Sequence, residues 1–560
     1  MAPVAIMTPN PQPQEAGWKA LISNRRCLGL ATFSALGGVL YGYNQGVFSN
    51  VQVQAEFHHR FQKTLENSTT KGMLTAILEL GAFLSSLVAG PISDRISRKH
   101  SITLWTIVFI VGVVVQTAAT YNVGMIYAGR WFAGMGVGGL STVVPMYNAE
   151  LAPAAIRGTL VGLQQVAICF GIMVSYWIAY GTAFIGGTTY PGQSSAAWRV
   201  PLGLQLAPAL VLAIGIRFLP YSPRWLMLHD RDDECLAVLA ELRAKPASDP
   251  DVQYEFSCLK AERLIHKDVA ERRYGVSKIT WREEMREYWR LVSTPGLRKR
   301  ATFGPLVQAF GQFSGINAIL YYAPTIFAQL GLTGGTTSLL ATGIIGVVLF
   351  VVTVPGALVA DSVGRRPLLM FASASMAISH AIIAALVAKY GSDFAKHKGA
   401  GYAAIVFGER MPRKTLMSVF WYTSSYGFGF GPVGWIISAE SCPLDQRARS
   451  VGIASAVNWI TNFTVAQITP IMLTNIGWKT FIVFMVFCVL CLIWVVIFLP
   501  ELKGLSLEEI DALFDDKSSE EERERRDEIA RSVGLGVAHG GDKELKPLSD
   551  VYYDNTGSKV

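Results

Sequence analysis

Charged residues are scarce in this chain of 560 residues. Asp, Glu, Lys and Arg together make up 16% of it, and 51% of the residues are hydrophobic. A soluble domain usually contains about 25% charged residues. The apolar residues form continuous runs of about 20, which is long enough for a helix to cross a bilayer. Because these runs do not alternate with polar residues, we expect helices rather than membrane strands.

Several motifs that would indicate other functions are missing. The sequence contains no Walker-type GxxxxGK[ST], no HExxH and no nucleophile elbow, so we expect no enzyme. The His residues are dispersed, which predicts no metal site and no cofactor. The seven cysteines form no clear pair in a predicted external loop, so no disulfide framework follows. The first 24 residues lack the apolar core of a signal peptide.

The apolar runs predict twelve membrane-spanning helices, six on each side of a polar segment. We place the helices at 29–48, 73–92, 101–119, 124–146, 158–182, 200–219, 302–327, 338–359, 367–388, 415–438, 450–473 and 479–499. The expected units are a segment 1–28, a six-helix half 29–224, a linker with short helices 225–298, a second half 299–500, and a tail 501–560 that is largely disordered at its end.

Positive charges in short loops predict the orientation of the chain. Clusters of Arg and Lys follow the spans 73–92, 338–359 and 415–438, so these loops and both termini are expected in the cytoplasm. The net charge of +8 therefore needs no nucleic-acid partner. Asn67 begins an Asn-Ser-Thr glycosylation sequon on the external side. Residues 389–414 conflict with this orientation, because they carry six Lys and Arg in a predicted external loop. Within them, the run 408–414 is either a real loop or a gene-model error.

The two halves of the sequence repeat each other in the same order. Asp94, Arg95 and Arg98 after the second span return as Asp361 and Arg365 after the eighth, and Glu150 with Arg157 returns as Glu440 with Arg447. Such repeats are typical of alternating-access carriers, which hold their substrate between the halves.

Three amides mark a candidate binding site in the stretch 308–322, QAFGQFSGINAILYY. Gln308 and Gln312 share one helical face, and Asn317 lies roughly 100–140° round from it. A membrane-buried amide costs free energy unless it is paired, so such a set usually lines a wet cavity. Neutral donors and acceptors suit a neutral, hydroxyl-rich solute. The alternative is that each amide only joins neighbouring helices.

Seven ordered blocks make the chain similar to the sugar porter family of the major facilitator superfamily, especially its fungal members. The blocks are GRWFAGMGVG (129–138), PMYNAELAPAAIRG (145–158), LPYSPRWL (219–226), GQFSGINAILYY (311–322), DSVGRRP (361–367), GPVGW (431–435) and PELKGLSLEEID (500–511). The resemblance implies the major facilitator fold, and a monomer that carries a hexose or pentose across the plasma membrane without a cofactor.

The resemblance also implies roles for individual residues. Positions that hold sugar hydroxyls match Gln165, Gln312, Asn317, Trp435 and Asn458, with Gln164, Gln308, Tyr321 and Trp459 as further members of the same wall. Either Trp459 or Trp435 could instead pack between helices. Cytoplasmic gate ion pairs match Arg224, Glu440, Arg447 and Glu501, beside the repeated loop charges Asp94, Arg95, Arg98, Glu150, Arg157, Asp361 and Arg365. We expect Asp94 with Arg98, and Glu150 with Arg157, to bridge helix ends.

One departure from the family bears on energy coupling. Asn44 stands where proton-coupled relatives place an aspartate that faces an arginine, matched here by Arg130. Because an amide cannot carry a proton, Asn44 favours facilitated diffusion. Glu79 is the one evident acid within a predicted span, and it either substitutes as the coupling group or pairs structurally with Arg130. A proton-coupled carrier of a sugar, disaccharide or polyol stays an alternative, and a non-transporting sugar sensor a distant one.

Overall fold

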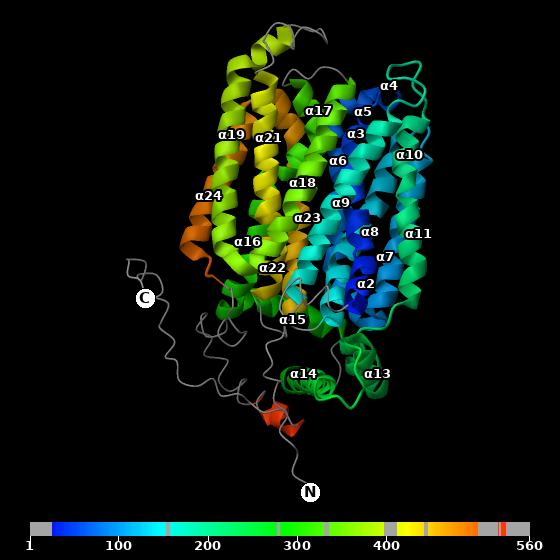
Figure 1. The fold of residues 1–560 in the computed structure, drawn as a ribbon, viewed down its shortest axis with the longest axis vertical. Coiled ribbons are helices and arrows are strands. Elements are labelled where there is room, and N and C mark those ends of the chain that lie inside the picture. Colours follow the sequence, from blue (N-terminus) through cyan, green and yellow to red (C-terminus); the bar gives the residue numbers. More distant parts are fainter. Residues whose placement is uncertain are drawn as a thin grey trace.

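The structure is a computed structural model that describes residues 25–152, 157–276, 280–329, 335–396, 411–441, 446–501, 525 and 528–533. Within these ranges every regular element is helical. The long helices run side by side as an elongated bundle (Figure 1). The all-α architecture predicted from the apolar runs is therefore confirmed.

The described helices group into twelve spanning units, six in each half. The first half contains α2 (Arg25–Ser34) with α3 (Leu36–Val51), α6 (Ser68–Ile96), α7 (Arg98–Thr117), α8 (Val123–Leu151), α9 (Arg157–Thr182), and α10 (Ala196–Leu204) with α11 (Leu206–Gly215). The second half contains α16 (Pro295–Phe313) with α17 (Ile316–Gln329), α18 (Gly335–Val363), α19 (Arg365–Lys396), α21 (Met411–Phe428) with α22 (Phe430–Glu440), α23 (Arg447–Asn475) and α24 (Lys479–Phe498).

Not every unit is a simple apolar helix. Among the described residues, seven helical stretches are long and apolar enough to cross a membrane by themselves. The other five units are α2–α3, α8, α16–α17, α21–α22 and α23. Three of them are broken into two helices, α8 is rich in glycine, and α23 carries many polar side chains. Several helices extend beyond the predicted spans. The largest difference is at α19, which continues to Lys396 instead of ending at 388, and α16 begins at Pro295 instead of 302. The run 408–414 enters α21 at Met411, and its first three residues lie outside the described part.

The repeat of the sequence is visible in the backbone between adjacent helices. Ser97 between α6 and α7 has a φ of 84°, and Gly364 between α18 and α19 has a φ of 109°. Arg98 donates to the Ser93 carbonyl at 3.2 Å, and Arg365 donates to the Ala360 carbonyl at 3.3 Å. Both halves thus turn from one helix into the next in the same way, although a serine adopts this backbone less readily than glycine.

Two pairs of helices form the largest contacts between the halves, α6 with α23 and α9 with α18. Glycines allow close approach in both places. A Cβ atom on Gly72 of α6 would lie 2.6 Å from the Gln467 carbonyl of α23, and one on Gly346 of α18 would lie 2.9 Å from Met173 Cα of α9. Small residues are the usual way for membrane helices to pack closely.

Short helices mark the two ends of the bundle. α12 (Pro223–Leu228), α13 (Asp232–Arg243), α14 (Pro250–Tyr274) and α15 (Trp281–Ser293) lie at one end, which we call the linker end. α4 (Ala55–Arg60) and α5 (Gln62–Glu66) lie at the opposite end, which we call the α4 end (Figure 1).

The linker helices are attached to both halves. The Trp225 indole of α12 donates to the Asp94 carbonyl at 2.9 Å, and Arg243 of α13 donates to the Leu151 carbonyl at 3.0 Å. On α15, Glu284 forms an ion pair with Arg449 of α23 at 2.7 Å. The linker is therefore anchored to the first half at its start and to the second half at its end.

Glu287 of α15 is the most buried acid of this attachment, with a side chain 2% exposed. It accepts hydrogen bonds from Tyr274 and Gln446, each at 2.7 Å. Burial alone would raise the pKa of Glu287, but these bonds and the charges of Arg273 and Arg449 outweigh it and hold the pKa below its usual value. The Glu287 contribution to stability is thus complete above the usual carboxyl pKa and is lost as the pH falls through the lowered one.

We predict that Glu287→Ala lowers the stability of the purified protein by about 1–3 kcal/mol at neutral pH, because it removes charge-assisted hydrogen bonds. The difference from wild type should shrink as the pH falls below the usual carboxyl range. Thermal melts from neutral to acidic pH measure it. Glu271→Ala is the control, since Glu271 is 52% exposed and pairs with Lys267 only at 4.0 Å. Equal melting curves for both variants would contradict the prediction.

Candidate functional site

A break between α16 and α17 organises the amides of the stretch 308–322. Gly315 lies in this break with a φ of 92°, and a Cβ there would lie 2.8 Å from the Phe484 ring. The Ser314 carbonyl accepts a hydrogen bond from Tyr422 at 2.9 Å and one from the His380 ring at 2.8 Å. These donors satisfy a backbone group that the break leaves without a helical partner.

The break brings Asn317 against Gln312. In an unbroken helix the two side chains would point in clearly different directions. Here the Asn317 amide nitrogen donates to Gln312 Oε1 at 2.5 Å. Gln312 Nε2 in turn donates to Asn458 Oδ1 of α23 at 2.6 Å. Three residues predicted to bind sugar are therefore in direct contact.

A fourth amide joins them from the other half. Gln45 of α3 donates from Nε2 to Asn317 Oδ1 at 3.1 Å. We call Gln45, Asn317, Gln312 and Asn458 the amide row. All four are at most 5% exposed. The amide row crosses from the first half of the protein to the second.

The remaining predicted amides lie apart from the amide row. Gln308 donates to Ser438 of α22 at 3.4 Å. Gln165 of α9 faces α22, where a Cβ on Gly431 would lie 3.3 Å from its Nε2. Gln164 instead packs against Gly38 of α3, within its own half. Trp435 is partly buried on α22.

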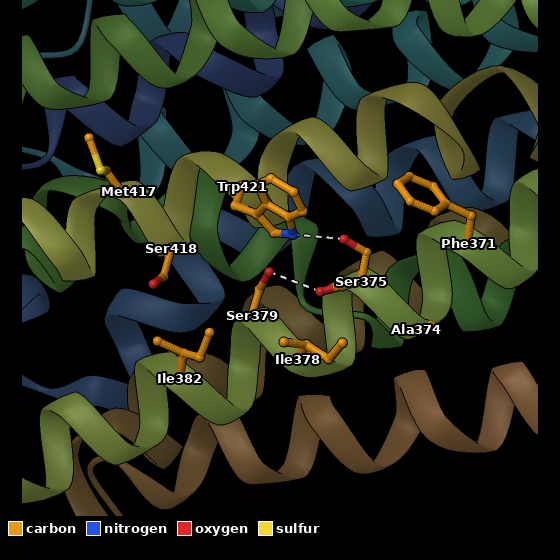
Figure 2. A pocket seen from close by; sticks show the side chains of 9 residues that line it. All are labelled: Phe371, Ala374, Ser375, Ile378, Ser379, Ile382, Met417, Ser418 and Trp421. Atoms are coloured by element: carbon orange, nitrogen blue, oxygen red, sulfur yellow. Dashed lines mark hydrogen bonds between the residues drawn. The ribbon is translucent and has the colours of Figure 1, made fainter.

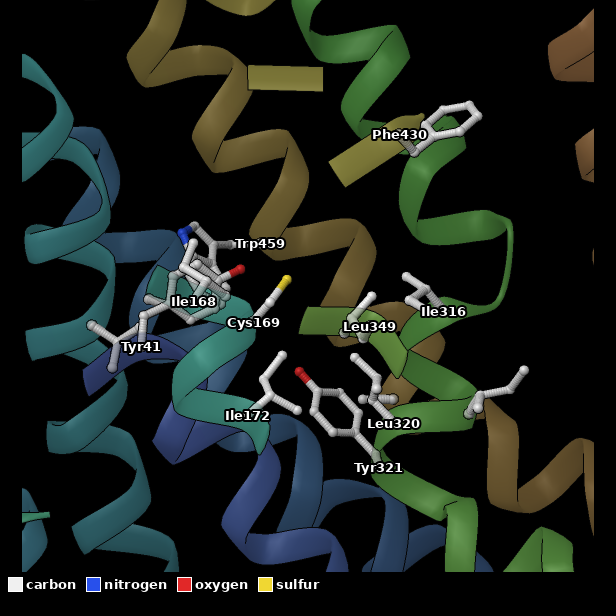
Figure 3. Close-up of a cluster of buried hydrophobic side chains, with 14 of the residues drawn as sticks. Tyr41, Ile168, Cys169, Ile172, Ile316, Leu320, Tyr321, Leu349, Phe430 and Trp459 are labelled. Carbon is white, nitrogen blue, oxygen red and sulfur yellow. The ribbon is translucent and has the colours of Figure 1, made fainter. Parts of the chain in front are cut away.

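The two other predicted wall residues connect the halves. The Tyr321 hydroxyl contacts Glu79, Gln45 and Asn462 at 2.5, 2.7 and 3.0 Å. The Trp459 indole donates to Ser141 of α8 at 3.3 Å, and its ring lies 4.8 Å from that of Tyr41. Figure 3 shows Tyr41 and Trp459 together, and Tyr321 on the other side of the same cluster. Trp459 thus already uses its N–H for packing between halves.

At the predicted coupling site, Arg130 of α8 does not form a direct ion pair with any acid that the structure describes. Arg130 donates to the Thr75 carbonyl at 2.8 Å and lies 3.9 Å from the centre of the Phe48 ring. The Asn44 amide has no hydrogen-bond partner among the described residues. Glu79 accepts from Tyr321, and none of the Arg130 nitrogens donates to it.

The predicted gate charges at the linker end pair within one half or with the linker. Arg98 binds Glu150 at 2.9 Å and Asp94 at 2.7 Å. Glu150 also accepts from Ser222 at 2.5 Å. The other described pairs are Arg224 with Glu262 at 2.5 Å, Arg95 over the Trp281 ring at 5.9 Å, and Glu501 with the backbone N–H groups of Arg365 and Arg366 at 3.1 and 3.0 Å.

Four predicted gate residues lie outside the part of the chain whose side chains are described. They are Arg157, Asp361, Glu440 and Arg447. The expected bridge between Asp94 and Arg98 is present. The expected bridge between Glu150 and Arg157 is not described, and Glu150 is occupied by Arg98 and Ser222.

Direct bonds between the halves occur at the α4 end. Lys71 donates to Thr325 at 3.4 Å, and Gln467 donates to the Thr69 carbonyl at 3.0 Å. Deeper in the bundle, the Tyr176 hydroxyl of α9 donates to the Leu320 carbonyl of α17 at 2.7 Å. The halves are therefore joined between the α4 end and the amide row.

Three residues of this site were not predicted from the sequence. Gln45 follows Asn44 inside a predicted span, and its polarity there was an available signal. Asn462 lies one helical turn after Asn458 and shares its face. His380 is a lone histidine within an apolar span, and its partner is a backbone carbonyl that no sequence pattern identifies.

A groove of about 570 Å³ lies elsewhere, between α19 and α21 (Figure 2). Its lining is mainly apolar, and Trp421, Ile378 and Phe371 are 60%, 60% and 53% exposed. The Trp421 indole donates to Ser375 at 2.8 Å. The groove is therefore a feature of the outer surface of the bundle and does not contain the amide row.

The family of the chain follows from comparison with known proteins. The family model described as sugar (and other) transporter matches residues 30–514. The protein therefore belongs to this family of multi-pass membrane proteins.

Individual relatives agree with this membership. The chain is 30% identical over 502 residues to the MFS glucose transporter mfs1 of Aspergillus flavus, with 87% of this chain and 89% of that protein covered. It is 31% identical to the hexose transporter HXT13 of Saccharomyces cerevisiae, with 86% and 81% covered. It is 32% identical to the quinate permease of Neurospora africana, with 89% and 90% covered.

A solved structure supports the fold. The proton:xylose symporter XylE bound to 6-bromo-6-deoxy-D-glucose superimposes with a TM-score of 0.69 at 25% identity. The match covers 87% of this chain and 99% of that one. The major facilitator fold, with its twelve helices in two halves, is thus confirmed.

We predict that Gly315→Ala destabilises the protein by more than about 2 kcal/mol, because it adds backbone strain and a clash with Phe484. Gly477→Ala is the matched control. Gly477 has a φ of 53° with nothing within 4 Å, so it should lose only about 1 kcal/mol. Thermal melts of the two variants measure the difference, and equal melting temperatures would contradict it.

Proposed function

We propose that the protein moves a monosaccharide, a hexose or a pentose, across the plasma membrane by alternating access. The amide row carries this proposal, because it places four neutral, buried hydrogen-bonding side chains between the two halves. Relatives named glucose and hexose transporters support a sugar as the substrate. This function is transport without chemical change, so it requires no catalytic residue.

The chemistry of the site suits a sugar. Both polar atoms of Gln164 have no hydrogen-bond partner among the described residues, and Asn458 Nδ2 makes no hydrogen bond of ordinary geometry, although the Tyr41 side chain interacts with Asn458. Buried polar atoms in this state cost free energy. Sugar hydroxyls both donate and accept, so they can satisfy either end of an amide. Trp435 adds an apolar face and one N–H donor for a pyranose ring.

We propose that the linker end is cytoplasmic and the α4 end external, in agreement with the basic loops. On this orientation the halves are joined on the external side of the amide row. The charges at the linker end then form the opposite gate. A gate biases the equilibrium between two states only if its pairs differ between them. We therefore propose that Arg98 and Glu150, now paired within one half, change partners when the linker end closes.

We propose facilitated diffusion as the mode of transport. Asn44 cannot take up a proton, and Arg130 is engaged by the Thr75 carbonyl and the Phe48 ring. One observation favours proton symport as the second candidate. Glu79 is a completely buried acid whose hydrogen bond to Tyr321 joins the two halves. A single chain contains the whole amide row, so we propose that the monomer is the working unit.

We predict that Gln312→Ala and Asn317→Ala each abolish uptake of labelled glucose in yeast that lacks its own hexose carriers. Each residue bonds to two neighbours in the amide row, so either change breaks it. Gln205→Ala is the control, because this buried amide donates only within its own segment, to the Leu202 carbonyl at 2.9 Å. Normal uptake by a surface-expressed Gln312→Ala would remove that residue from the site.

The same assay separates the two modes of transport. Facilitated diffusion predicts that the sugar equilibrates without accumulating, and that a protonophore leaves the initial rate unchanged. Accumulation that collapses with the protonophore would establish symport and direct attention to Glu79. Xylose and quinate belong in the substrate panel, because relatives are named for them.

We propose that Asn67 carries an N-linked glycan on the external side. Its exposed side chain caps α6 by accepting from the N–H groups of Thr69 and Thr70 at 2.9 and 3.4 Å. We predict a glycosidase-sensitive shift on gels that Asn67→Gln removes. Asn122→Gln is the control, since Asn122 caps α8 in the same way, accepting from Gly124 at 2.8 Å, but begins no sequon. Absence of any shift in the wild type would contradict the prediction.

A further inference from the structure

The Tyr321 hydroxyl has no hydrogen-bonding capacity left. A tyrosine hydroxyl donates once and accepts at two lone pairs. A carboxylate only accepts, so the contact with Glu79 at 2.5 Å uses the donor. The amide nitrogens of Gln45 and Asn462 at 2.7 and 3.0 Å then fill both lone pairs. Gln45 is therefore held with its nitrogen toward Tyr321.

The orientation of Gln45 fixes the orientation of the next amide, and so on along the amide row; we call this dependence the relay. Gln45 Nε2 uses its second hydrogen on Asn317 Oδ1. Asn317 then donates to Gln312 Oε1, and Gln312 donates to Asn458 Oδ1. The row ends at Asn458 Nδ2, which makes no hydrogen bond of ordinary geometry among the described residues, although the Tyr41 side chain interacts with Asn458. Because Nδ2 has two hydrogens, it still has a donor for a substrate. Along the row from Gln45 to Asn458, each hydrogen bond thus runs from donor to acceptor in the direction away from Glu79.

Among the described residues, Glu79 is the group that fixes the direction of the hydrogen bonds in the amide row. An amide that turns by 180° exchanges donor and acceptor, so four amides alone could form the row in either sense. A hydroxyl group can also rotate, so that its hydrogen points to a different acceptor. A carboxylate cannot donate, and hydrogen bonds in a buried chain polarise one another. If Glu79 did not accept from it, Tyr321 could donate to Gln45 Oε1, and the row could invert.

We propose that Glu79 and Gln45 are positioning residues that orient the amide row, so that it presents a donor, Asn458 Nδ2, to an oxygen of the substrate. This role rests on the proposed function, because the donor matters only if the site holds a sugar. It needs no proton transfer. The substrate atom at Asn458 is then an acceptor, and a sugar that keeps an acceptor there binds better than one that does not.

Deoxy and deoxyfluoro analogues of glucose test the orientation. A fluorine keeps acceptor character, whereas a deoxy carbon loses both donor and acceptor. At one ring position the wild type should bind the fluoro analogue more tightly than the deoxy analogue, by about threefold to tenfold, as expected for one hydrogen bond. Competition against labelled glucose on purified protein measures this ratio without requiring transport.

Glu79→Leu and Gln45→Leu should each reduce that ratio to about one, because Glu79→Leu removes the acceptor of the Tyr321 hydroxyl and Gln45→Leu removes the link to Asn317, while glucose binding is weakened but retained. Gln45→Leu leaves the charges of Glu79 and Arg130 in place, so it tests the relay even if Glu79→Leu fails to fold. Tyr43→Phe is the control, since it removes a similarly buried hydroxyl that donates to the Pro201 carbonyl at 2.9 Å within the first half and does not contact the amide row. Its ratio should equal that of the wild type.

Three results would overturn the proposal. A folded Gln45→Leu that binds glucose and keeps the wild-type ratio would overturn the relay alone and leave the proposed function standing. A wild type that binds neither glucose nor any analogue would overturn the proposed function, and the relay with it. A ratio lost equally in Tyr43→Phe would show a general structural effect and overturn the relay.

Discussion

A break in a membrane-spanning helix exposes backbone groups to a medium that offers no water, and each must find a partner inside the protein. The break between α16 and α17 meets this constraint at Ser314, whose carbonyl accepts from both Tyr422 and His380. Gly315 supplies the backbone conformation, and the Phe484 ring fills the space that a side chain would need. Because the break is fixed in this way, Asn317 faces Gln312, and the amide row exists.

The same break explains how the site can respond to movement of the halves. α16 carries Gln312 and contacts α22 and α23 of its own half. α17 carries Tyr321 and the Leu320 carbonyl, which bond to α3, α6 and α9 of the other half. α16 and α17 follow each other in the sequence, but α16 packs within its own half whereas α17 bonds to the other half. Displacement of α17 would change the bonds between halves without removing α16 from its own half.

Much of the fold follows from the sequence because a bilayer leaves few choices. Apolar runs of spanning length must be helices, and paired loop motifs must reflect a repeated unit. Most spans and the repeat around Ser97 and Gly364 could be predicted for this reason. The end of α19 was missed because Lys389 and Lys396 continue a helix beyond the apolar run, and charge alone does not end a helix.

The site could be predicted only in part, because its members come from helices far apart in the chain. Gln312 and Asn317 stand out as amides in an apolar stretch, but the sequence does not show that Gln45 reaches them. It also does not show that Trp459 uses its indole N–H on Ser141. The family resemblance assigns residues by position, and it assigns no sugar contact to Glu79 or Gln45.

The role of Glu79 in orienting the amide row does not depend on whether Glu79 takes up a proton. Tyr321 occupies one carboxylate oxygen, and the other has no hydrogen-bond partner among the described residues. A proton added to this second oxygen would leave the bond from Tyr321 and the direction of the amide row unchanged. The row would invert only if the carboxyl group rotated and donated to Tyr321, which would first have to lose Gln45 or Asn462. The direction of the amide row is therefore maintained because the Tyr321 hydroxyl has no free hydrogen-bonding capacity. This holds for facilitated diffusion and for proton symport alike.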